Sequence, residues 1–322
     1  MDNNERKVFW DALCSMHDET PEHKQSLLAT IKKPNRLCRY RTVNENSLMQ
    51  LQENKLHYSS ADYYDDPFDT FVHVDYERVK EAYTVLCNIV HSDDPSYLKA
   101  FKVLEPIIGI SVEQYFKFLK EHPFDLSSFP ESVRQIRTII QKNLFSICFC
   151  EDELNETLWL KYANNYKGFA LVYDIKNEST FLCGKSGECK NCRSMMEKPF
   201  TYPVYYSENT YDATLFALTC MLGIGSRIIP SQTVMWEAKR VSLIKKKCHE
   251  YDIEWRMIRP TMSPNRTCIK MKPDKVILGL RMPAYERMQV ISAARIAGIS
   301  RVEELYINDS DRLDSKKVFE IS

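Results

Sequence analysis

Charged and aromatic side chains gather in three short stretches that lie far apart in the sequence. These stretches are Arg39-Tyr40-Arg41, the run YSSADYYDDPFD from Tyr58 to Asp69, and Asp252-Ile253-Glu254-Trp255-Arg256. Each has the composition of a β-strand end that carries charge on one face. We therefore expect three strand ends around one pocket, in which guanidinium groups would hold an anion and carboxylates would stabilise positive charge.

The stretch YDIEWRM alternates with the period of two residues that is typical of a strand. Its apolar residues fall on one side, and Asp252, Glu254 and Arg256 fall on the other. Two carboxylates and a guanidinium are costly to bury without partners, so this face lies against water or a cleft. In a cleft, Glu254 is the best candidate in the chain for acid–base chemistry or charge stabilisation. An ion pair with Arg256 is the structural alternative.

The same alternation in RLCRYRTV places Arg39 and Arg41 on one strand face. Paired guanidinium groups suit phosphates or carboxylates, whereas two solvated arginines on an exposed face are the structural alternative.

In the tyrosine- and aspartate-rich run, a strand is expected to end at Ser59-Ser60, and Asp66-Pro67 predicts a tight turn. Its tyrosines could stack on a flat ligand with carboxylates nearby: Tyr58, Tyr63 and Tyr64 beside Asp65, Asp66 and Asp69. The structural alternative is a turn in which the aspartates cap backbone N–H groups.

Three cysteines in FLCGKSGECKNCRS have the spacing C-x5-C-x2-C: Cys183, Cys189 and Cys192. Zinc takes four ligands and this segment supplies three, so a fourth would come from elsewhere in the chain. Cys248 or His249, just before YDIEWR, is the favoured source; Cys148, Cys150 and Cys220 remain open. Three free cysteines in a loop are the alternative to a structural zinc site.

Composition limits the function classes. The 322 residues contain 44 Lys plus Arg and 44 Asp plus Glu, so no global basic field indicates a nucleic-acid binder. Eleven cysteines, no run of the roughly 20 apolar residues that span a membrane and no secretion signal predict a cytoplasmic protein that is not membrane-bound. Motifs for P-loop, Rossmann, zincin and α/β-hydrolase enzymes are absent.

The order of patterns predicts one α+β domain over residues 1–322, with a core of two small, packed, mostly antiparallel sheets. Expected strands are interrupted by N-terminal helices at about 1–35, a helical subdomain at about 72–143, a cysteine-bearing loop at about 180–200 and a mostly helical segment at 210–248. Two domains divided near residue 144 are the alternative.

The ordered set RYRTVNENSLMQLQENKLHYSSADYYDDPFD, SICFCEDELNETLWLKYANNYKGFALVYD and YDIEWRMI resembles the bacterial family known as domain of unknown function 2971. The resemblance covers about residues 36 to 280. Matching positions are Arg39 and Tyr40; Asp66, Pro67, Phe68 and Asp69; Trp159, Tyr162, Ala163 and Gly168; and Glu254 with Arg256. Asp65 stands where the family usually has Asn, and Asp252 replaces the first Glu of its Glu-x-Glu pattern.

The motif order of that family is similar to the order in mono-ADP-ribosyltransferases. The similarity implies an ADP-ribosyltransferase-like fold and an NAD-consuming toxin or effector, in bacterial anti-phage defence, with an unknown protein or nucleic-acid acceptor and an antitoxin or other defence partner. Arg39 and Arg41 would hold the NAD phosphates, Tyr58 and Ser59 would shape the nicotinamide side, and Tyr64 would stack.

On the same analogy, Glu254, with Asp252 beside it, would stabilise the positively charged sugar. A non-enzymatic binding or sensor module, and a metal-dependent nuclease built on the three aspartates, are the alternatives.

Overall fold

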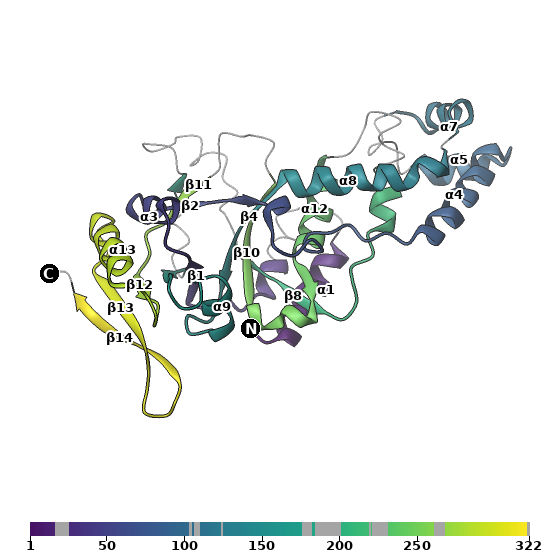
Figure 1. Ribbon diagram of the computed structural model, residues 1–322. Coiled ribbons are helices and arrows are strands. Elements are labelled where there is room, and N and C mark those ends of the chain that lie inside the picture. Colours follow the sequence, from purple (N-terminus) through teal and green to yellow (C-terminus); the bar gives the residue numbers. More distant parts are fainter. Residues whose placement is uncertain are drawn as a thin grey trace.

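The computed structural model describes residues 1–16, 26–102, 105, 110–123, 125–175, 182–183, 201–218, 220, 231–260 and 268–320. In this part of the chain, one large sheet of nine strands forms the centre of the molecule, in the order β14-β13-β12-β5-β1-β4-β10-β7 with β3 paired to β4 (Figure 1). Its strands are β1 (Arg36–Arg41), β3 (Ser59–Ser60), β4 (Leu144–Cys150), β5 (Phe169–Asp174), β7 (Thr201–Pro203), β10 (Glu254–Pro260), β12 (Lys275–Leu278), β13 (Arg301–Ile307) and β14 (Leu313–Glu320).

Within the described residues, neighbouring strands of this sheet are antiparallel except β12 and β13, which are parallel. Two smaller sheets accompany it: β2 (Lys55–His57), β11 (Cys268–Lys270) and β6 (Leu182–Cys183), and the parallel pair β8 (Tyr205–Ser207) and β9 (Ile244–Lys246). The expected mixture of helices with mostly antiparallel strands is therefore present. The expected core of two small packed sheets is wrong, because β4 pairs with both β1 and β10 and so joins their strands into one sheet.

Helices cover both faces of the large sheet. On one face, α3 (Glu45–Gln52) and α13 (Ala284–Ile296) pack over side chains that include Leu37, Phe149 and Trp255. On the other face, α9 (Glu156–Lys161) packs Trp159 against Cys38, Val172 and their neighbours. The alternation of strand side chains thus fills two separate apolar layers.

Helix α3 begins after Asn44, because the side chain of Asn44 accepts a hydrogen bond from the backbone N–H of Ser47, and the Ser47 hydroxyl accepts one from the Asn44 N–H. Helix α13, by contrast, had no counterpart among the expected elements. The segment expected to be helical to residue 248 contains α12 (Ser231–Ser242), but it then forms β9 and the 3₁₀ helix η5 (Lys247–Asp252).

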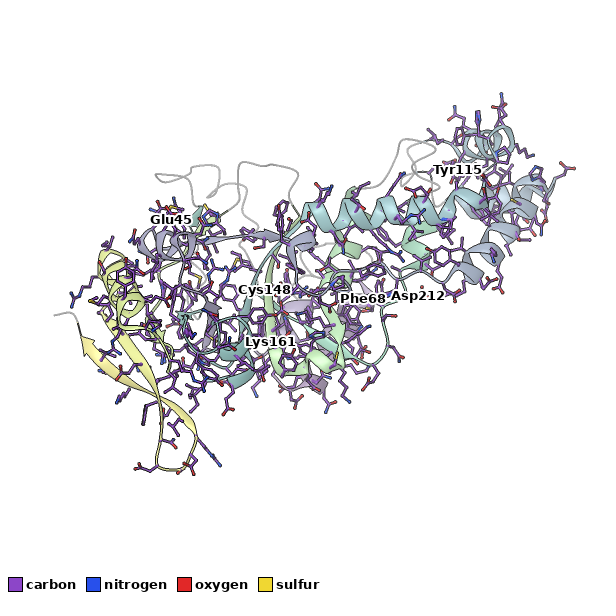
Figure 2. All side chains as sticks on the ribbon, in the orientation of Figure 1. Glu45, Phe68, Tyr115, Cys148, Lys161 and Asp212 are labelled. Carbon is purple, nitrogen blue, oxygen red and sulfur yellow. The ribbon has the colours of Figure 1, made fainter. Side chains whose placement is uncertain are left out.

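A helical arm extends from the sheet, on the right in Figure 1. It contains α4 (Tyr76–His91), α5 (Pro95–Phe101), α7 (Val112–Glu121), η3 (Leu126–Ser128) and α8 (Phe129–Asn143), which agrees with the expected helical character of 72–143. Figure 2 shows Tyr115 far along this arm, well away from Cys148 at the centre of the sheet. None of the helices described here is long and apolar enough to cross a lipid bilayer.

The N-terminal helix α1 (Asn3–Ser15) supports the edge of the sheet near β10. The buried guanidinium of Arg6 donates hydrogen bonds to the backbone oxygens of Val204, at 2.9 Å, and Glu254, at 2.7 Å, and to the carboxylate of Glu151, at 2.6 Å. The hydroxyl of Tyr206 accepts the backbone N–H of Glu254 at 2.7 Å. Both ends of the Glu254 peptide are therefore fixed by groups outside the central strands.

Candidate active site

A cavity of about 740 Å³ opens where β1 and β4 separate. These strands of six and seven residues share a single register pair, Cys38 opposite Cys150. Beyond that pair β4 is joined instead by β3, through Ser59 opposite Ser146. The fork leaves backbone and side chains of both strands facing an open space, whose volume is within the range of about 300–1,000 Å³ usual for small-molecule sites.

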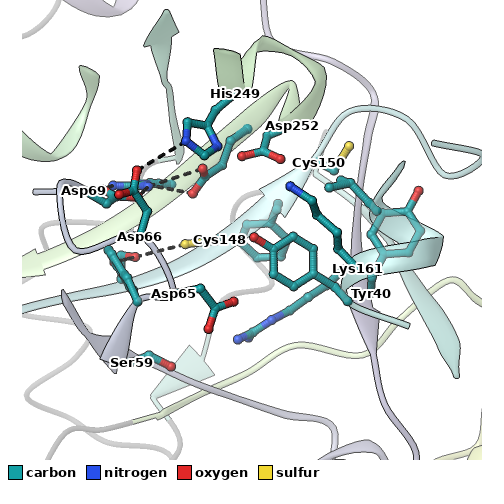
Figure 3. A pocket seen from close by; sticks show the side chains of 18 of the residues that line it. Tyr40, Ser59, Asp65, Asp66, Asp69, Cys148, Cys150, Lys161, His249 and Asp252 are labelled. Atoms are coloured by element: carbon teal, nitrogen blue, oxygen red, sulfur yellow. Dashed lines mark hydrogen bonds and ion pairs between the residues drawn. The ribbon is translucent and has the colours of Figure 1, made fainter. Parts of the chain in front are cut away.

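The three chemically promising stretches all contribute to this cavity (Figure 3). The residues of the expected site that line it are Arg39, Arg41, Ser59, Tyr64, Asp252 and Glu254. Tyr58 is not among the lining residues. Its side chain is buried in the apolar core with Leu56 and Phe149, so its expected role beside a nicotinamide ring is wrong.

Arg256 is the centre of a buried ion-pair cluster on one side of the cavity. Its guanidinium donates to both oxygens of Asp69, at 2.7 and 2.5 Å, and to the carboxylate of Glu254, at 2.7 Å from Nε. It also donates to the backbone oxygen of Ser242 at 2.7 Å, and it lies over the ring of Tyr64, 5.1 Å from the centroid. With these partners, Arg256 is completely buried and fully engaged.

Lys245 contacts the two carboxylates of the Arg256 cluster and adds Asp252 to it. Its ammonium lies 2.6 Å from Oε2 of Glu254, 3.2 Å from Oδ2 of Asp252 and 3.3 Å from Oδ2 of Asp69. Burial opposes the charge of Glu254, but Arg256 and Lys245 outweigh it and hold the pKa of Glu254 well below its usual range. Glu254 is therefore an ionised hydrogen-bond acceptor, and it does not act as a proton donor at neutral pH.

Asp252 has a different environment from Glu254. It lies in η5 and not in the strand, because Ile253 adopts a left-handed conformation with φ of 42° and interrupts the alternation. Burial raises the pKa of Asp252, although Lys245 favours its charged form. Its Oδ1 is buried and, among the described residues, has no hydrogen-bond partner. This carboxylate is thus the member of the cluster with an unused acceptor on the cavity wall.

Another part of the cavity wall carries two arginines that have no acidic partner among the described residues. In the described part of the chain, no carboxylate forms an ion pair with Arg39 or Arg41; Arg41 donates to the side chain of Gln50 at 2.7 Å, and Nη1 of Arg39 is buried without a partner. Burial lowers the pKa of both groups, and repulsion from Arg39 contributes to lowering the pKa of Arg41 to about 9. Both guanidinium groups remain cationic at neutral pH, so this wall is prepared for an anion.

Aromatic side chains form a further part of the cavity wall. The hydroxyl of Tyr64 is hydrogen-bonded to Ser146, which fixes the ring against Arg256. Tyr63 and Tyr162 also line the cavity and are 81% and 41% exposed. They offer more accessible stacking surfaces than the pinned Tyr64, whereas Trp159, on the same short helical segment as Tyr162, is buried in the core.

The aspartates of the Tyr58–Asp69 run make different contacts. Both oxygens of Asp69 accept hydrogen bonds from Arg256. Asp66 caps the turn by accepting the backbone N–H of Phe68 at 2.9 Å, and its other oxygen lies 3.3 Å from Nε2 of His249. Within the described residues, no group of three or more His, Cys, Asp or Glu side chains is placed to hold a metal ion. These contacts give Asp66 and Asp69 partners other than a shared metal.

The expected zinc ligands are only partly within the described structure. Cys189 and Cys192 lie outside it, and Cys183 is described only as a backbone position in β6, opposite Ile269 of β11. Cys248 has an exposed side chain in η5. The zinc site therefore stays a prediction.

Sequence reasoning missed several lining residues, among them Lys245, His249, Lys161 and Cys148 as parts of one site. Lys245 stands in the basic run Lys245–Lys247, near the end of the segment expected to be mostly helical. The only available signal was the proximity of that run to YDIEWR. No family model matches this chain, and neither the curated proteins nor the solved structures contain a match to it.

Proposed function

We propose that the cavity binds NAD and that the protein transfers its ADP-ribosyl group to an acceptor. The observation that carries the proposal is that one cavity is lined both by two arginines that have no acidic partner among the described residues and by the carboxylates of Asp252 and Glu254. Arg39 and Arg41 would each neutralise part of the pyrophosphate. An exposed ring, Tyr63 or Tyr162, would stack on a flat base.

The carboxylate wall would act on the ribose next to the nicotinamide. As the glycosidic bond breaks, positive charge develops on the sugar, and fixed negative groups nearby lower the energy of that transition state. Glu254 is ionised but shares its charge with Arg256 and Lys245. Asp252, with Oδ1 unpaired, is therefore the stronger candidate to accept a ribose hydroxyl and to face the developing charge.

The test is to measure NAD binding and nicotinamide release by the purified protein, and then by Arg39→Met. Methionine removes the charge and keeps a long side chain, and Nη1 of Arg39 has no hydrogen-bond partner to lose among the described residues. The variant should therefore fold normally and bind NAD at least tenfold more weakly, as expected for loss of a charge-assisted hydrogen bond of about 1.5–3 kcal/mol. Arg36→Met on the same strand is the matched control, because Arg36 is exposed and does not line the cavity.

Inorganic pyrophosphate separates the anion site from the reaction. It should compete with NAD in the wild type and fail to bind Arg39→Met. Wild-type protein that neither binds NAD nor releases nicotinamide, with candidate acceptors present, would reject the proposal.

A second candidate function is a non-enzymatic binding or sensor module. The observation in its favour is that two cations already neutralise Glu254, as in a purely structural ion-pair cluster. Such a module would bind NAD or another phosphate-bearing nucleotide through Arg39 and Arg41, without any release of nicotinamide. Substitution of Glu254 alone does not distinguish the two functions, because it also breaks a buried ion pair. Asp252→Asn is more informative, since it removes the unpaired carboxylate and leaves the Arg256 contacts in place.

A further inference from the structure

The guanidinium of Arg41 is hydrogen-bonded to an uncharged side chain from outside the cavity. Its Nη2 donates to the side-chain oxygen Oε1 of Gln50 at 2.7 Å. A guanidinium can only donate, so the amide of Gln50 turns its oxygen, and not its nitrogen, towards Arg41. Arg41 lines the cavity, whereas Gln50 does not. Any influence of Gln50 on a bound ligand therefore passes through Arg41.

Secondary structure holds both ends of this hydrogen bond. Arg41 is the last residue of β1, where it is paired with Phe169 of β5. Gln50 lies on α3, which the Asn44 cap starts close behind the end of that strand. Its neighbour Leu51 is buried in the core, so the helix cannot turn about its axis without exposing an apolar side chain. The fold therefore fixes Gln50 beside Arg41 before any ligand arrives.

Because its partner is uncharged, Arg41 keeps its full positive charge for a ligand. A carboxylate in the place of Gln50 would form an ion pair with Arg41 and compete with an incoming anion. Burial, together with repulsion from Arg39, lowers the pKa of Arg41 to about 9, so the two cations influence each other. Two neighbouring guanidinium groups that are held but not neutralised suit a ligand with two adjacent negative charges, such as a diphosphate.

We propose that Gln50 is a positioning residue of the anion site: it orients Arg41 for the phosphates of the ligand and, being neutral, leaves the charge of Arg41 to them. This inference rests on the proposed function, in which Arg41 binds one phosphate of NAD. A purely structural hydrogen bond would change ligand affinity only together with stability. A positioning residue changes the two independently, and Gln50→Glu separates them, because it keeps the shape of the side chain and adds a negative charge.

The experiment measures the binding of inorganic pyrophosphate and of NAD by titration calorimetry, and the melting temperature without ligand, for the wild type, Gln50→Glu and Gln50→Leu. The carboxylate of the first variant would pair with Arg41, so both ligands should bind about ten- to a hundredfold more weakly. The same ion pair should leave the melting temperature equal to or above the wild-type value. In NAD turnover, this variant should raise KM and leave kcat nearly unchanged.

Gln50→Leu removes the hydrogen bond without adding charge, so it should weaken the binding of both ligands less, by about two- to tenfold. Gln52→Glu is the matched control, because Gln52 is exposed on the same helix, and it should bind both ligands as the wild type does.

Unchanged pyrophosphate affinity in Gln50→Glu, a loss that accompanies a lowered melting temperature, or an equal loss in Gln52→Glu overturns this inference; NAD binding and cleavage by the wild type would still support the proposed function. A wild type that binds pyrophosphate, with the expected loss in Gln50→Glu, but does not bind NAD overturns the proposed function alone. A wild type that binds neither ligand overturns both.

Discussion

Arg256 and Asp69 are 187 residues apart in the sequence and are joined by two hydrogen bonds, of 2.7 and 2.5 Å. The pair connects β10 to the turn that follows β3, and so it connects two of the three stretches whose side chains line the cavity. Because Arg256 also binds the backbone of Ser242, at the end of α12, this single side chain links three segments. The shape of the cavity therefore depends on a buried ionic contact as well as on apolar packing.

Replacement of Arg256 by methionine should strongly destabilise the fold. The change would leave Asp69 and Glu254 buried with only Lys245 to balance them. Removal of one partner from a buried ion pair typically costs about 3–5 kcal/mol in the free energy of unfolding. Urea unfolding followed by circular dichroism measures this difference.

Arg134→Met provides the matched comparison, since Arg134 pairs with Glu131 on the exposed face of α8. An exposed pair of this kind contributes about 0–1 kcal/mol. Equal unfolding midpoints for the two variants would show that the Arg256 cluster contributes nothing special to stability.

Local alternation correctly predicted that Glu254 and Arg256 share a face of a strand, because that feature depends only on strand geometry. It could not reveal that Asp69 and Lys245 neutralise them, since these contacts arise only when distant segments pack together. Alternation misplaced Asp252 in the strand, because the left-handed backbone at Ile253 interrupts the pattern. A left-handed backbone is unfavourable for a β-branched residue such as Ile253, so the sequence gives no reason to expect it there.

The sheet architecture also depends on contacts between distant segments, which local sequence patterns do not reveal. The strands around Arg39 and Glu254 were recognised from their alternation, but the pairing of β4 with both β1 and β10 was not. The fork that opens the cavity follows from the single register pair between Cys38 and Cys150, a tertiary feature that no periodicity encodes. For Tyr58, composition suggested a stacking residue, whereas the position places its ring in the core.

The cysteine-bearing segment yields a prediction about metal content. We propose that Cys183, Cys189 and Cys192 bind one structural zinc with a fourth ligand, and Cys248 or His249 is the expected source. Protein purified without added metal should contain about one zinc per chain by elemental analysis, and chelation should lower the melting temperature. Cys189→Ser should lose the metal, whereas Cys87→Ser on α4 should keep it. Metal-free protein with three freely reactive thiols would identify ordinary loop cysteines.

Asp252 and Glu254 should respond to pH in opposite directions. Burial is the largest influence on Asp252 and raises its pKa, so the folded protein holds this proton to a higher pH than the unfolded chain, whose value is about 3.9. As pH rises above about 4, ionisation of Asp252 therefore reduces stability. The pKa of Glu254 is lowered by Arg256 and Lys245 despite burial, so its contribution is present above about 4.3 and is lost as pH falls.

Asp252→Asn should consequently be more stable than the wild type at pH 7, because it removes the carboxylate charge that burial disfavours. The advantage should shrink as pH is lowered towards 4, because protonation of the folded wild type removes the carboxylate charge that burial disfavours. Glu254→Gln is the matched control with the opposite sign: it should be less stable than the wild type at pH 7, with a deficit that shrinks on acidification. Urea unfolding of the three proteins between about pH 2 and pH 8 measures both trends. If Asp252→Asn were destabilised at pH 7 as much as Glu254→Gln, Asp252 would be an integral partner of the ion-pair cluster, and the case for its carboxylate as the free acceptor on the cavity wall would fail.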